Sequence, residues 1–422
     1  MKKVAVVGTG IAGMAAGYFL RKHFDVTFYE KQNRPGGHTN TVNVEEDGVS
    51  IPIDTGFIVF NYETYPKLKR FFEELEIPLF PTSMSFSVQQ KVLGLEYCGT
   101  GVAGLFAQKK NIFNLRFLKL LFEINRFNQE AVEVLDNPAF KNVSLQQYAD
   151  RKKYSRDLLD LYLIPMSSAV WSTPPDTMLG FSAGTLVRFF KNHGLLGGIS
   201  GHLQWYTVKG GSRVYRDKVL GLFPGKVFTG NAVTEVRREA SGVALTDSRG
   251  HKSIYDHVVL AGHADETLDI LKDASAVERD LLGKFKYQKN RAVLHTDSSV
   301  MPKKKIAWSS WNYLIQKNAA NRLEASTVYW MNGLQNVSQK RDYFVSINDP
   351  DNISKDKIFW QTDYEHPVFD VESQITQREL YRLNHKKKVL FCGSYFKYGF
   401  HEDAFVSGLQ AARALGGGDG WA

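Results

Sequence analysis

Residues 1–20 read MKKVAVVGTGIAGMAAGYFL, and this stretch decides the fold. A short β-branched run at residues 3–7 ends at Gly8, and an apolar helical pattern starts after Gly13. Glycines at the GxGxxG spacing allow a sharp turn, close approach of the backbone to a pyrophosphate, and tight packing of a helix on a strand. The stretch therefore predicts a dinucleotide-binding turn, with diphosphate contacts from Gly8, Gly10, Ile11, Ala12 and Gly13.

An acidic residue and a second glycine loop follow. The expected second strand, residues 25–29, ends in Glu30, where a carboxylate can accept hydrogen bonds from a ribose. The next segment contains a glycine pair, which lets the backbone approach a phosphate, and an arginine that can pair with it. A nicotinamide dehydrogenase does not need this second loop. We expect further cofactor contacts from Lys31, Arg34, Gly36, Gly37 and His38.

Both glycine loops together resemble the FAD fingerprint of the flavin amine oxidase and phytoene desaturase superfamily. The residues that carry this resemblance are Gly8, Gly10, Gly13, Glu30, Arg34, Gly36 and Gly37. In that family the Arg-x-Gly-Gly element holds the FAD diphosphate, so the resemblance implies FAD as the cofactor. We expect the FAD to be noncovalent, because Cys392 falls within a strand and no cysteine precedes it where some relatives attach the flavin.

The C-terminal end resembles the closing motif of the same family, a strand and glycine loop followed by a helix that covers the flavin. Residues 389–392 are the expected strand, and a helical pattern runs through residues 407–412. Ser394 stands where many members carry aspartate, so we expect a hydroxyl contact and weaker FAD binding than usual. The motif implies cofactor contacts from Gly393, Ser394, His401, Glu402, Asp403 and Ala404.

The resemblance spans nearly the whole chain and implies an α/β fold of two interleaved domains. The Rossmann-like FAD-binding domain is expected at residues 1–80, 205–270 and 385–422, and an α+β substrate domain at residues 81–204 and 271–384. Strands are expected at residues 231–236 and 256–261, on either side of a hairpin at residues 242–250. In the family, the segment matching Val233 meets the adenine, and the segment with Thr55, Gly56 and Phe57 passes beside the flavin.

Little side-chain chemistry is expected, because a flavin itself accepts the hydride at N5. Phe400 matches a position where the family places an aromatic side chain above the flavin. Tyrosine and tryptophan pairs suit amines, whereas phenylalanine suits an apolar group equally well. His401, Glu402 and Asp403 either act at the site or cap the helix, whose N-terminus favours the anionic form of the two acids. His295 lies where we would look for the family lysine near N5, and it is either catalytic or structural.

Three elements resemble one bacterial branch of the superfamily, which often accompanies cyclopropane-fatty-acid-synthase-like enzymes. They are residues 308–313, 364–367 and 399–403. The analogy suggests a lipid acyl chain or an amine as the small-molecule substrate of an FAD-dependent oxidoreductase that attacks a C–N or C–C bond. Two alternatives remain: a fatty-acyl desaturase, saturase or isomerase that works with such a synthase, and a non-catalytic flavin-binding accessory protein.

Composition limits the broad class. The 422 residues, 43% of them hydrophobic, fit a globular protein of more than one domain. The two cysteines, Cys98 and Cys392, are too few for a disulfide framework or a zinc cluster, and we expect no metal. There is neither a signal-peptide pattern nor an apolar run of 18 residues, so we expect a cytoplasmic protein without a membrane span.

The net charge of +9 comes from 53 Lys and Arg against 44 Asp and Glu. The excess gathers at 303–305, at 386–388 and in an expected amphipathic helix at 105–127. That helix has its apolar face at Phe113, Phe117, Leu120, Leu121, Ile124 and Phe127, and its cations are Lys109, Lys110, Arg116, Lys119 and Arg126. It either meets the anionic inner face of a membrane or has a solvated polar face. No nucleic-acid motif accompanies these clusters, so we expect no nucleic-acid partner. The sequence sets no oligomeric state.

Overall fold

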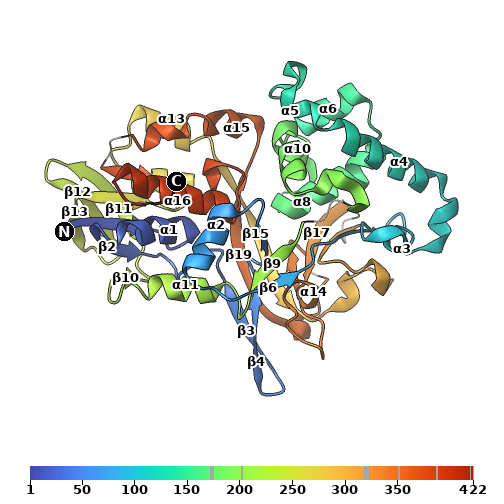
Figure 1. The fold of residues 1–422 in the computed structure, drawn as a ribbon, viewed down its shortest axis with the longest axis horizontal. Helices are drawn as coiled ribbons and strands as arrows, with labels where there is room; N and C mark the ends of the chain where they lie inside the picture. The colour runs from blue at the N-terminus through green and yellow to red at the C-terminus, as the bar shows by residue number, and fades with distance from the viewer. Residues whose placement is uncertain are drawn as a thin grey trace.

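The computed structural model describes residues 1–171, 175–200, 203–317, 321, 323–349, 352–385, 388–418 and 420–421. Two lobes lie side by side (Figure 1). The first contains the N-terminus, the C-terminal helix and a small parallel sheet. The second contains the largest sheet and a group of helices. Of residues 386–388, one of the predicted lysine clusters, only Lys388 lies within the described residues.

The first lobe is built on a parallel sheet in the order β10-β2-β1-β14-β20. The chain runs from β1 to β2 on one side and returns as β14 on the other side of β1. The carboxyl end of β1 is therefore a topological switch point, the place where doubly wound sheets bind ligands. The strands are β1 (Lys2–Val7), β2 (Phe24–Tyr29), β10 (Val227–Phe228), β14 (His257–Leu260) and β20 (Val389–Phe391).

Two long helices pack together on this sheet. Every residue of α1 (Ile11–Leu20) is buried, and α16 (His401–Ala414) lies directly against it. Their close approach depends on Gly408, because a Cβ there would overlap the backbone carbonyl of Ala12. The lobe also holds α2 (Pro66–Glu74), α11 (Arg213–Leu220), α12 (Ala264–Ile270) and α13 (Ala276–Leu282), with the antiparallel sheet of β11 (Val233–Glu239), β12 (Gly242–Asp247) and β13 (Lys252–Tyr255).

The second lobe is organised by a seven-stranded sheet in the order β19-β15-β18-β17-β16-β7-β8. Its two longest strands, β15 and β19, pair with each other and lie in the middle of the molecule, next to the first lobe (Figure 1). The strands are β7 (Phe86–Gln90), β8 (Leu95–Cys98), β15 (Lys286–His295), β16 (Trp311–Lys317), β17 (Leu323–Trp330), β18 (Phe344–Ile347) and β19 (Ile358–Val368). Two smaller sheets lie nearby: β3 (Thr41–Glu46) with β4 (Val49–Asp54), and β5 (Phe60–Asn61) with β9 (Trp205–Val208) and β6 (Leu79–Thr82).

A helical group covers the outer part of this lobe. The helix predicted over residues 105–127 is wrong as one element, since the chain there forms three pieces. The side chain of Asn114 accepts from the N–H of Phe117 and starts a new helix. The elements are α3 (Gly101–Leu105), a 3-10 turn (Lys109–Phe113), α4 (Leu115–Glu130), α5 (Glu133–Asp136), α6 (Leu145–Lys152), α8 (Ile164–Trp171) and α10 (Ala183–Asn192).

The predicted α/β fold, with a Rossmann-like domain and a second domain, is confirmed. The expected strands are present with small shifts, for example Val233–Glu239 in place of 231–236. The expected boundaries between the interleaved domains stay a prediction. None of the described helices is both long and apolar enough to cross a bilayer.

Candidate functional site

The first glycine loop has the geometry of a phosphate site. Gly8 has a φ of +101°, and a Cβ on Gly13 would overlap the carbonyl oxygen of Gly8, so both positions require glycine. Gly10 differs, because a Cβ there meets nothing within 4 Å. No side chain caps the first turn of α1, and that turn holds no acid. The first N–H groups of a helix have no acceptor within it, so those of Ile11 and Ala12 can bind an anion.

Glu30 follows β2 and lies beside this loop. Its carboxylate accepts from the backbone N–H of Thr9 at 3.1 Å, from the Thr9 hydroxyl at 2.6 Å, and from the N–H of Gln32 at 3.0 Å. The segment before β11 runs next to it, with the N–H of Asn231 donating to the carbonyl of Glu30. Val233 is buried two residues farther on. Glu30 and Val233 thus lie at one end of the loop, where a ribose and an adenine were expected.

The second glycine loop is tied to the first by one hydroxyl. Thr9 Oγ1 accepts from the N–H of Gly36 at 2.9 Å while it donates to Glu30. Gly37 packs against Gly10, since a Cβ on Gly37 would lie 3.4 Å from the Cα of Gly10. The two glycine loops are therefore in contact, beside the open space that a Cβ on Gly10 would enter.

Arg34 and Lys31 have other partners than those expected. The guanidinium of Arg34 donates to the carbonyl of Gly37 at 3.0 Å and that of Thr39 at 3.3 Å, so it braces its own loop. Burial lowers its pKa. Lys31 forms an ion pair with Glu266. The terminal nitrogens of Arg34 thus bind backbone carbonyls, and the expected pairing of its guanidinium with a phosphate stays a prediction.

His263, Glu266 and Glu365 offer ligand atoms within 4.8 Å of one another. The ammonium of Lys31 already lies on Glu266 and supplies a positive charge there. We assign no metal to this group.

The segment from Thr55 to Phe57 runs along the second loop. The N–H of Phe57 donates to the carbonyl of His38 at 2.8 Å, and a Cβ on Gly56 would overlap that carbonyl. The ring of His38 stacks on Tyr364 of β19 with 4.7 Å between centroids. Its Nε2 is buried and has no hydrogen-bond partner among the described residues. Burial lowers the pKa of His38 well below its usual value, so the free nitrogen is available to a neutral or donating ligand group.

His401 is placed against the same segment by the C-terminal helix. Its imidazole stacks on Phe57, with 3.8 Å between centroids and an interplanar angle of 11°. Nε2 lies 3.0 Å from the hydroxyl of Tyr215, which in turn lies 2.6 Å from Thr39 Oγ1. Burial lowers the pKa of His401 to about 3, so the ring is neutral. The structure thus brings His401 to the predicted flavin side with a fixed orientation.

The two acids after His401 act as caps. Glu402 accepts from the N–H groups of Lys67 and Leu68, at 2.9 and 2.8 Å, and so caps α2. Asp403 accepts from the N–H groups of Tyr398 and Phe400 and caps α16. Burial raises the pKa of Glu402 to about 7 and that of Asp403 to about 6, and it outweighs the backbone N–H groups, which favour the anionic forms.

The loop before α16 closes over the end of the parallel sheet. The N–H of Gly393 donates to Ser407 Oγ at 2.9 Å, and Gly393 packs near the carbonyl of Gly262 after β14. Ser394 is half-buried, and Ala404 is buried in the core. This loop therefore lies at the switch point, next to the first glycine loop.

Phe400 connects this loop to the helical group. Its ring stacks on Phe189 of α10, with 5.0 Å between centroids, and lies 6.0 Å from Trp171 of α8. The indole N–H of Trp171 donates to the carbonyl of Tyr398 at 3.0 Å. His193 completes the cluster, and burial lowers its pKa to about 4. We call these four side chains, Phe400, Phe189, Trp171 and His193, the aromatic cluster.

His295 has a structural role. Its Nε2 lies 2.8 Å from Ser346 Oγ, and its Nδ1 accepts from the N–H of Asp297 at 3.1 Å. It packs against Phe344, whereas its strand neighbour Leu294 packs with Ile53 on the other face of the sheet. The expected place beside N5 is therefore wrong, because both ring nitrogens are used on the far face.

We expect His295→Gln to lower the free energy of unfolding by about 2 kcal/mol at pH 7, since a buried hydrogen bond is lost. Burial lowers the pKa of His295 to about 4, against about 6.5 in an unfolded chain. Between about pH 4 and about pH 6.5 the unfolded state binds more protons than the folded state. The stabilisation by neutral His295 is therefore complete above about pH 6.5 and is lost as the pH falls towards about 4. Urea unfolding at pH 7 and pH 5 should show a smaller pH dependence in the variant. An equal dependence in both proteins would contradict the assignment.

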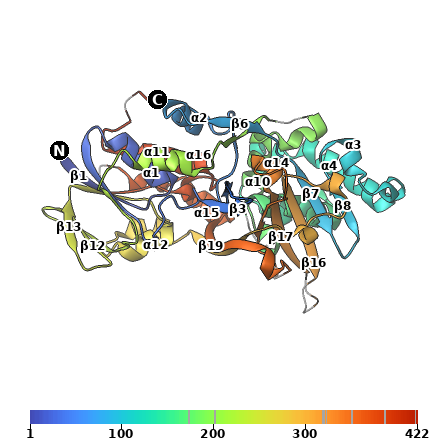
Figure 2. The same ribbon diagram turned by 90° about the horizontal axis from the view of Figure 1, so that it is seen from below.

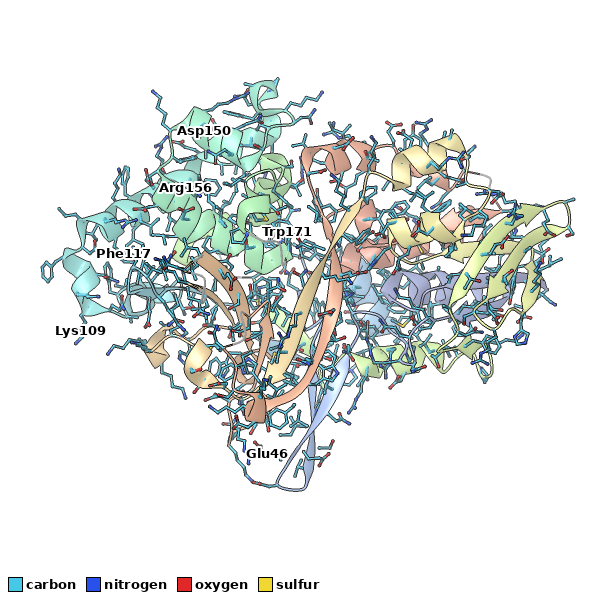
Figure 3. The ribbon with its side chains drawn as sticks, turned by 180° about the vertical axis from the view of Figure 1, so that it is seen from behind. Glu46, Lys109, Phe117, Asp150, Arg156 and Trp171 are labelled. Atoms are coloured by element: carbon cyan, nitrogen blue, oxygen red, sulfur yellow. The ribbon has the colours of Figure 1, made fainter. Side chains whose placement is uncertain are left out.

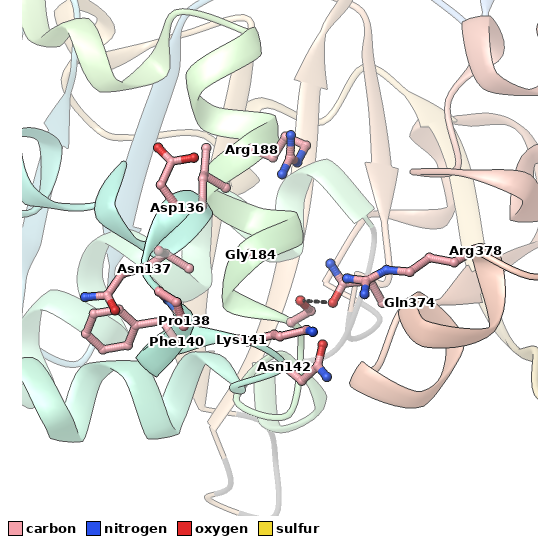
Figure 4. A pocket seen from close by; sticks show the side chains of 13 residues that line it. Asp136, Asn137, Pro138, Phe140, Lys141, Asn142, Gly184, Arg188, Gln374 and Arg378 are labelled. Carbon is pink, nitrogen blue, oxygen red and sulfur yellow. Dashed lines mark hydrogen bonds between the residues drawn. The ribbon is translucent and has the colours of Figure 1, made fainter.

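A separate cleft of about 370 Å³ lies between the helical group and α15 (Val371–Gln377) (Figure 4). Two of its lining residues are joined across it, since the hydroxyl of Ser182 donates to Gln374 Oε1 at 2.6 Å. The cations Lys141, Arg188 and Arg378 line it, but none of the predicted cofactor residues does. The cleft is therefore distinct from the glycine loops.

Sequence reasoning missed several residues of the site. Thr9 lies inside the glycine motif, where its hydroxyl could have been noticed. Thr39 and Tyr215 contact His401 from distant parts of the chain, and no local pattern marks them. Tyr364 stacks on His38, and the sequence marked it only as part of the segment 364–367. Trp171 and Phe189 belong to helices that are apolar for packing reasons as well.

Comparison with known proteins agrees with this geometry. A family model described as an NAD(P)-binding Rossmann-like domain matches residues 6–75. The coproporphyrinogen III oxidase of Staphylococcus aureus is 40% identical over 55 residues, and the match spans 12% of this chain and 11% of that protein.

Solved structures match over nearly the whole chain. A redesigned putrescine oxidase is 16% identical, with 98% of this chain and 99% of that chain covered and a TM-score of 0.68. A fatty acid isomerase from P. acnes that produces CLA is 13% identical, with 98% of each chain covered and a TM-score of 0.68. The cyclohexylamine oxidase of Brevibacterium oxydans is 15% identical, with 98% of each chain covered and a TM-score of 0.67. The chain therefore has the amine-oxidase-like fold that its sequence predicts.

Proposed function

We propose that this chain binds FAD noncovalently and is an FAD-dependent oxidoreductase. The observation that carries the proposal is the pair of facing glycine loops, Gly10 against Gly37, beside an uncapped helix N-terminus. The carboxylate of Glu30 lies beside Thr9 of the first loop. The second loop ends at His38, whose Nε2 is buried and has no hydrogen-bond partner among the described residues. The shared fold with oxidases supports the same assignment.

Each part of the cofactor has a set of residues that would hold it. The N–H groups of the first turn of α1 and the backbone of Gly36 and Gly37 would bind the diphosphate. Glu30 would accept from the ribose, and the backbone near Val233 would meet the adenine. Phe57 and His401 would lie beside the isoalloxazine. When bound, FAD supplies a two-electron acceptor that takes a hydride at N5.

The protein's own contribution is orientation and exclusion of water. His401 and His193 are neutral, because burial lowers the pKa of one to about 3 and of the other to about 4. The carboxylates of Glu402 and Asp403 are engaged by backbone N–H groups. Neither Glu402 nor Asp403 therefore offers a free carboxylate to the ammonium group of an amine substrate. The aromatic cluster suits an apolar chain, and we infer that the substrate is a lipid acyl chain rather than an amine.

The reaction is tested by mixing the FAD-loaded protein with substrates under anaerobic conditions and following flavin absorbance. Unsaturated and saturated fatty acyl compounds should bleach the flavin, or be converted with transient bleaching, whereas primary amines should not. Bleaching by amines alone would support an amine oxidase and contradict the acyl assignment. A flavin that is loaded and photoreducible but that no member of the panel bleaches would favour an accessory protein that binds FAD without turnover.

Thr9→Val should weaken FAD binding about tenfold, because valine keeps the shape of threonine but loses the hydrogen bonds to Glu30 and Gly36. Fluorescence titration of the apoprotein with FAD measures the change. Thr234→Val is the matched control, since Thr234 is exposed on β11 of the same lobe. Equal FAD affinity in Thr9→Val and the control would contradict the role of Thr9.

A further inference from the structure

Helix α4 has two apolar faces, and only one of them is used for folding. Phe117, Leu120 and Phe127 are buried against the helical group. Leu115 and Phe122 are 81% and 69% exposed. Residues 115, 118 and 122 recur at the three- and four-residue spacing that places side chains on one side of a helix, here the side opposite the core. The expected apolar face was therefore right for Phe117, Leu120 and Phe127, was wrong for Phe113, and missed the second face.

The exposed face continues onto the preceding elements. Phe113, at the end of the 3-10 turn, is 87% exposed, and Val102 of α3 is 66% exposed. In Figures 1 and 2, α3 and α4 lie at the end of the molecule opposite the N-terminus, and Figure 3 labels Lys109 at this outer end. We call this surface the distal patch. Its apolar members are Val102, Ile112, Phe113, Leu115, Leu118 and Phe122.

Three lysines lie among these apolar side chains. Lys109, Lys110 and Lys119 are exposed, and none forms an ion pair within the part of the chain that the structure describes. In contrast, Arg116 pairs with Asp157 at 2.6 Å and Arg126 pairs with Glu130 at 3.2 Å. Of the five cations expected for a membrane contact, the two arginines are thus paired with acids, and the three lysines are left to meet lipid phosphates.

The lysine cluster at residues 303–305 contributes less than its charge suggests. The ammonium of Lys305 lies 3.6 Å from the carboxylate of Asp342 and 5.0 Å from the ring centroid of Trp308. That cation is engaged by its neighbours, so the distal patch rests on Lys109, Lys110 and Lys119.

We propose that the distal patch docks on an anionic lipid bilayer. Large exposed apolar side chains that gather at one end of a molecule mark an interaction surface. The three lysines beside them are complementary to lipid phosphates, and Phe113, Leu115 and Phe122 would enter the boundary between headgroups and acyl chains. The proposal rests on exposure and charge and does not depend on the proposed oxidoreductase function.

Vesicle flotation tests the proposal with the full chain. Vesicles of phosphatidylcholine with 30% phosphatidylglycerol should bind the protein at low salt, and pure phosphatidylcholine vesicles should bind it at least about tenfold more weakly. Lys109→Gln/Lys110→Gln/Lys119→Gln should remove the dependence on lipid charge. Phe113→Ser/Phe122→Ser should lower the partition coefficient about tenfold or more, at low salt and at high salt alike.

The matched control is Lys252→Gln/Ile254→Ser, which changes one exposed lysine and one exposed apolar residue on β13 of the other lobe. It should bind vesicles as the wild type does. Thermal unfolding and FAD content of each variant verify that the fold persists. Equal loss of binding in the control and in the patch variants would overturn the proposal.

Insertion can be measured directly. Cys98 and Cys392 are buried, so a polarity-sensitive dye on Phe113→Cys reports on the patch alone. Its emission should shift to the blue on anionic vesicles and be quenched by brominated acyl chains. The proposal is wrong if the wild type ignores anionic vesicles. It is also wrong if the dye responds only to protein concentration, with a doubled mass in sedimentation velocity, since the patch would then bind a second copy.

Discussion

Gly10→Val is expected to abolish FAD binding and to leave the fold intact. Gly10 has a φ of −61° and a ψ of 174°, an extended conformation that valine adopts readily. A Cβ at this position meets no protein atom within 4 Å. The added Cβ therefore meets no protein atom, and it projects into the open space beside the first turn of α1, where the diphosphate would lie. We expect at least about a hundredfold loss of FAD affinity, which corresponds to about 2.7 kcal/mol.

The matched control is Gly197→Val. A Cβ at Gly197 also meets nothing within 4 Å, and this residue lies in the other lobe. Calorimetry with FAD, together with the unfolding temperature of each apoprotein, separates loss of binding from loss of fold. Gly10→Val with wild-type FAD affinity would contradict the placement of the diphosphate beside Gly10.

Gly408→Val is expected to lower the free energy of unfolding by about 3 kcal/mol. The reason is that a Cβ on Gly408 would overlap the carbonyl oxygen of Ala12, and the Ala15 methyl would lie 3.0 Å away. Helix α16 would have to move off α1, which separates two buried surfaces. Because α16 also carries His401, we expect FAD affinity to fall along with stability.

Urea unfolding of the apoprotein measures this effect, with Gln410→Ala on the exposed side of the same helix as the control. The control should change the unfolding free energy by less than about 0.5 kcal/mol. A Gly408→Val protein as stable as the control would show that the two helices are not in close contact.

The glycine loops could be predicted because their geometry is local. The glycines of the turn lie within six consecutive residues. Only α1 and β2 separate this turn from Glu30, so local structure also sets the position of the acid. The partners of Glu402 could not be predicted in this way. Its carboxylate caps α2, 335 residues earlier in the chain, and only the packing of α16 against α2 brings them together.

The role of each charged residue was harder to predict than its position. Arg34 was expected to pair with phosphate, but its donors find three backbone carbonyls within its own loop. His295 was expected near the flavin because its strand matches one that approaches the flavin in the family, yet a residue's face on a strand changes with a shift of one position. The bulge between Leu294 and His295 makes that face unpredictable from alternation alone.

The most direct test of the central claim is the uptake of FAD by the purified chain. We predict that the apoprotein binds one FAD per chain, with flavin absorbance bands that shift on binding, and that Gly10→Val binds none under the same conditions. Wild-type protein that takes up no added FAD, while remaining folded by circular dichroism, would contradict the claim that the glycine loops form a flavin site.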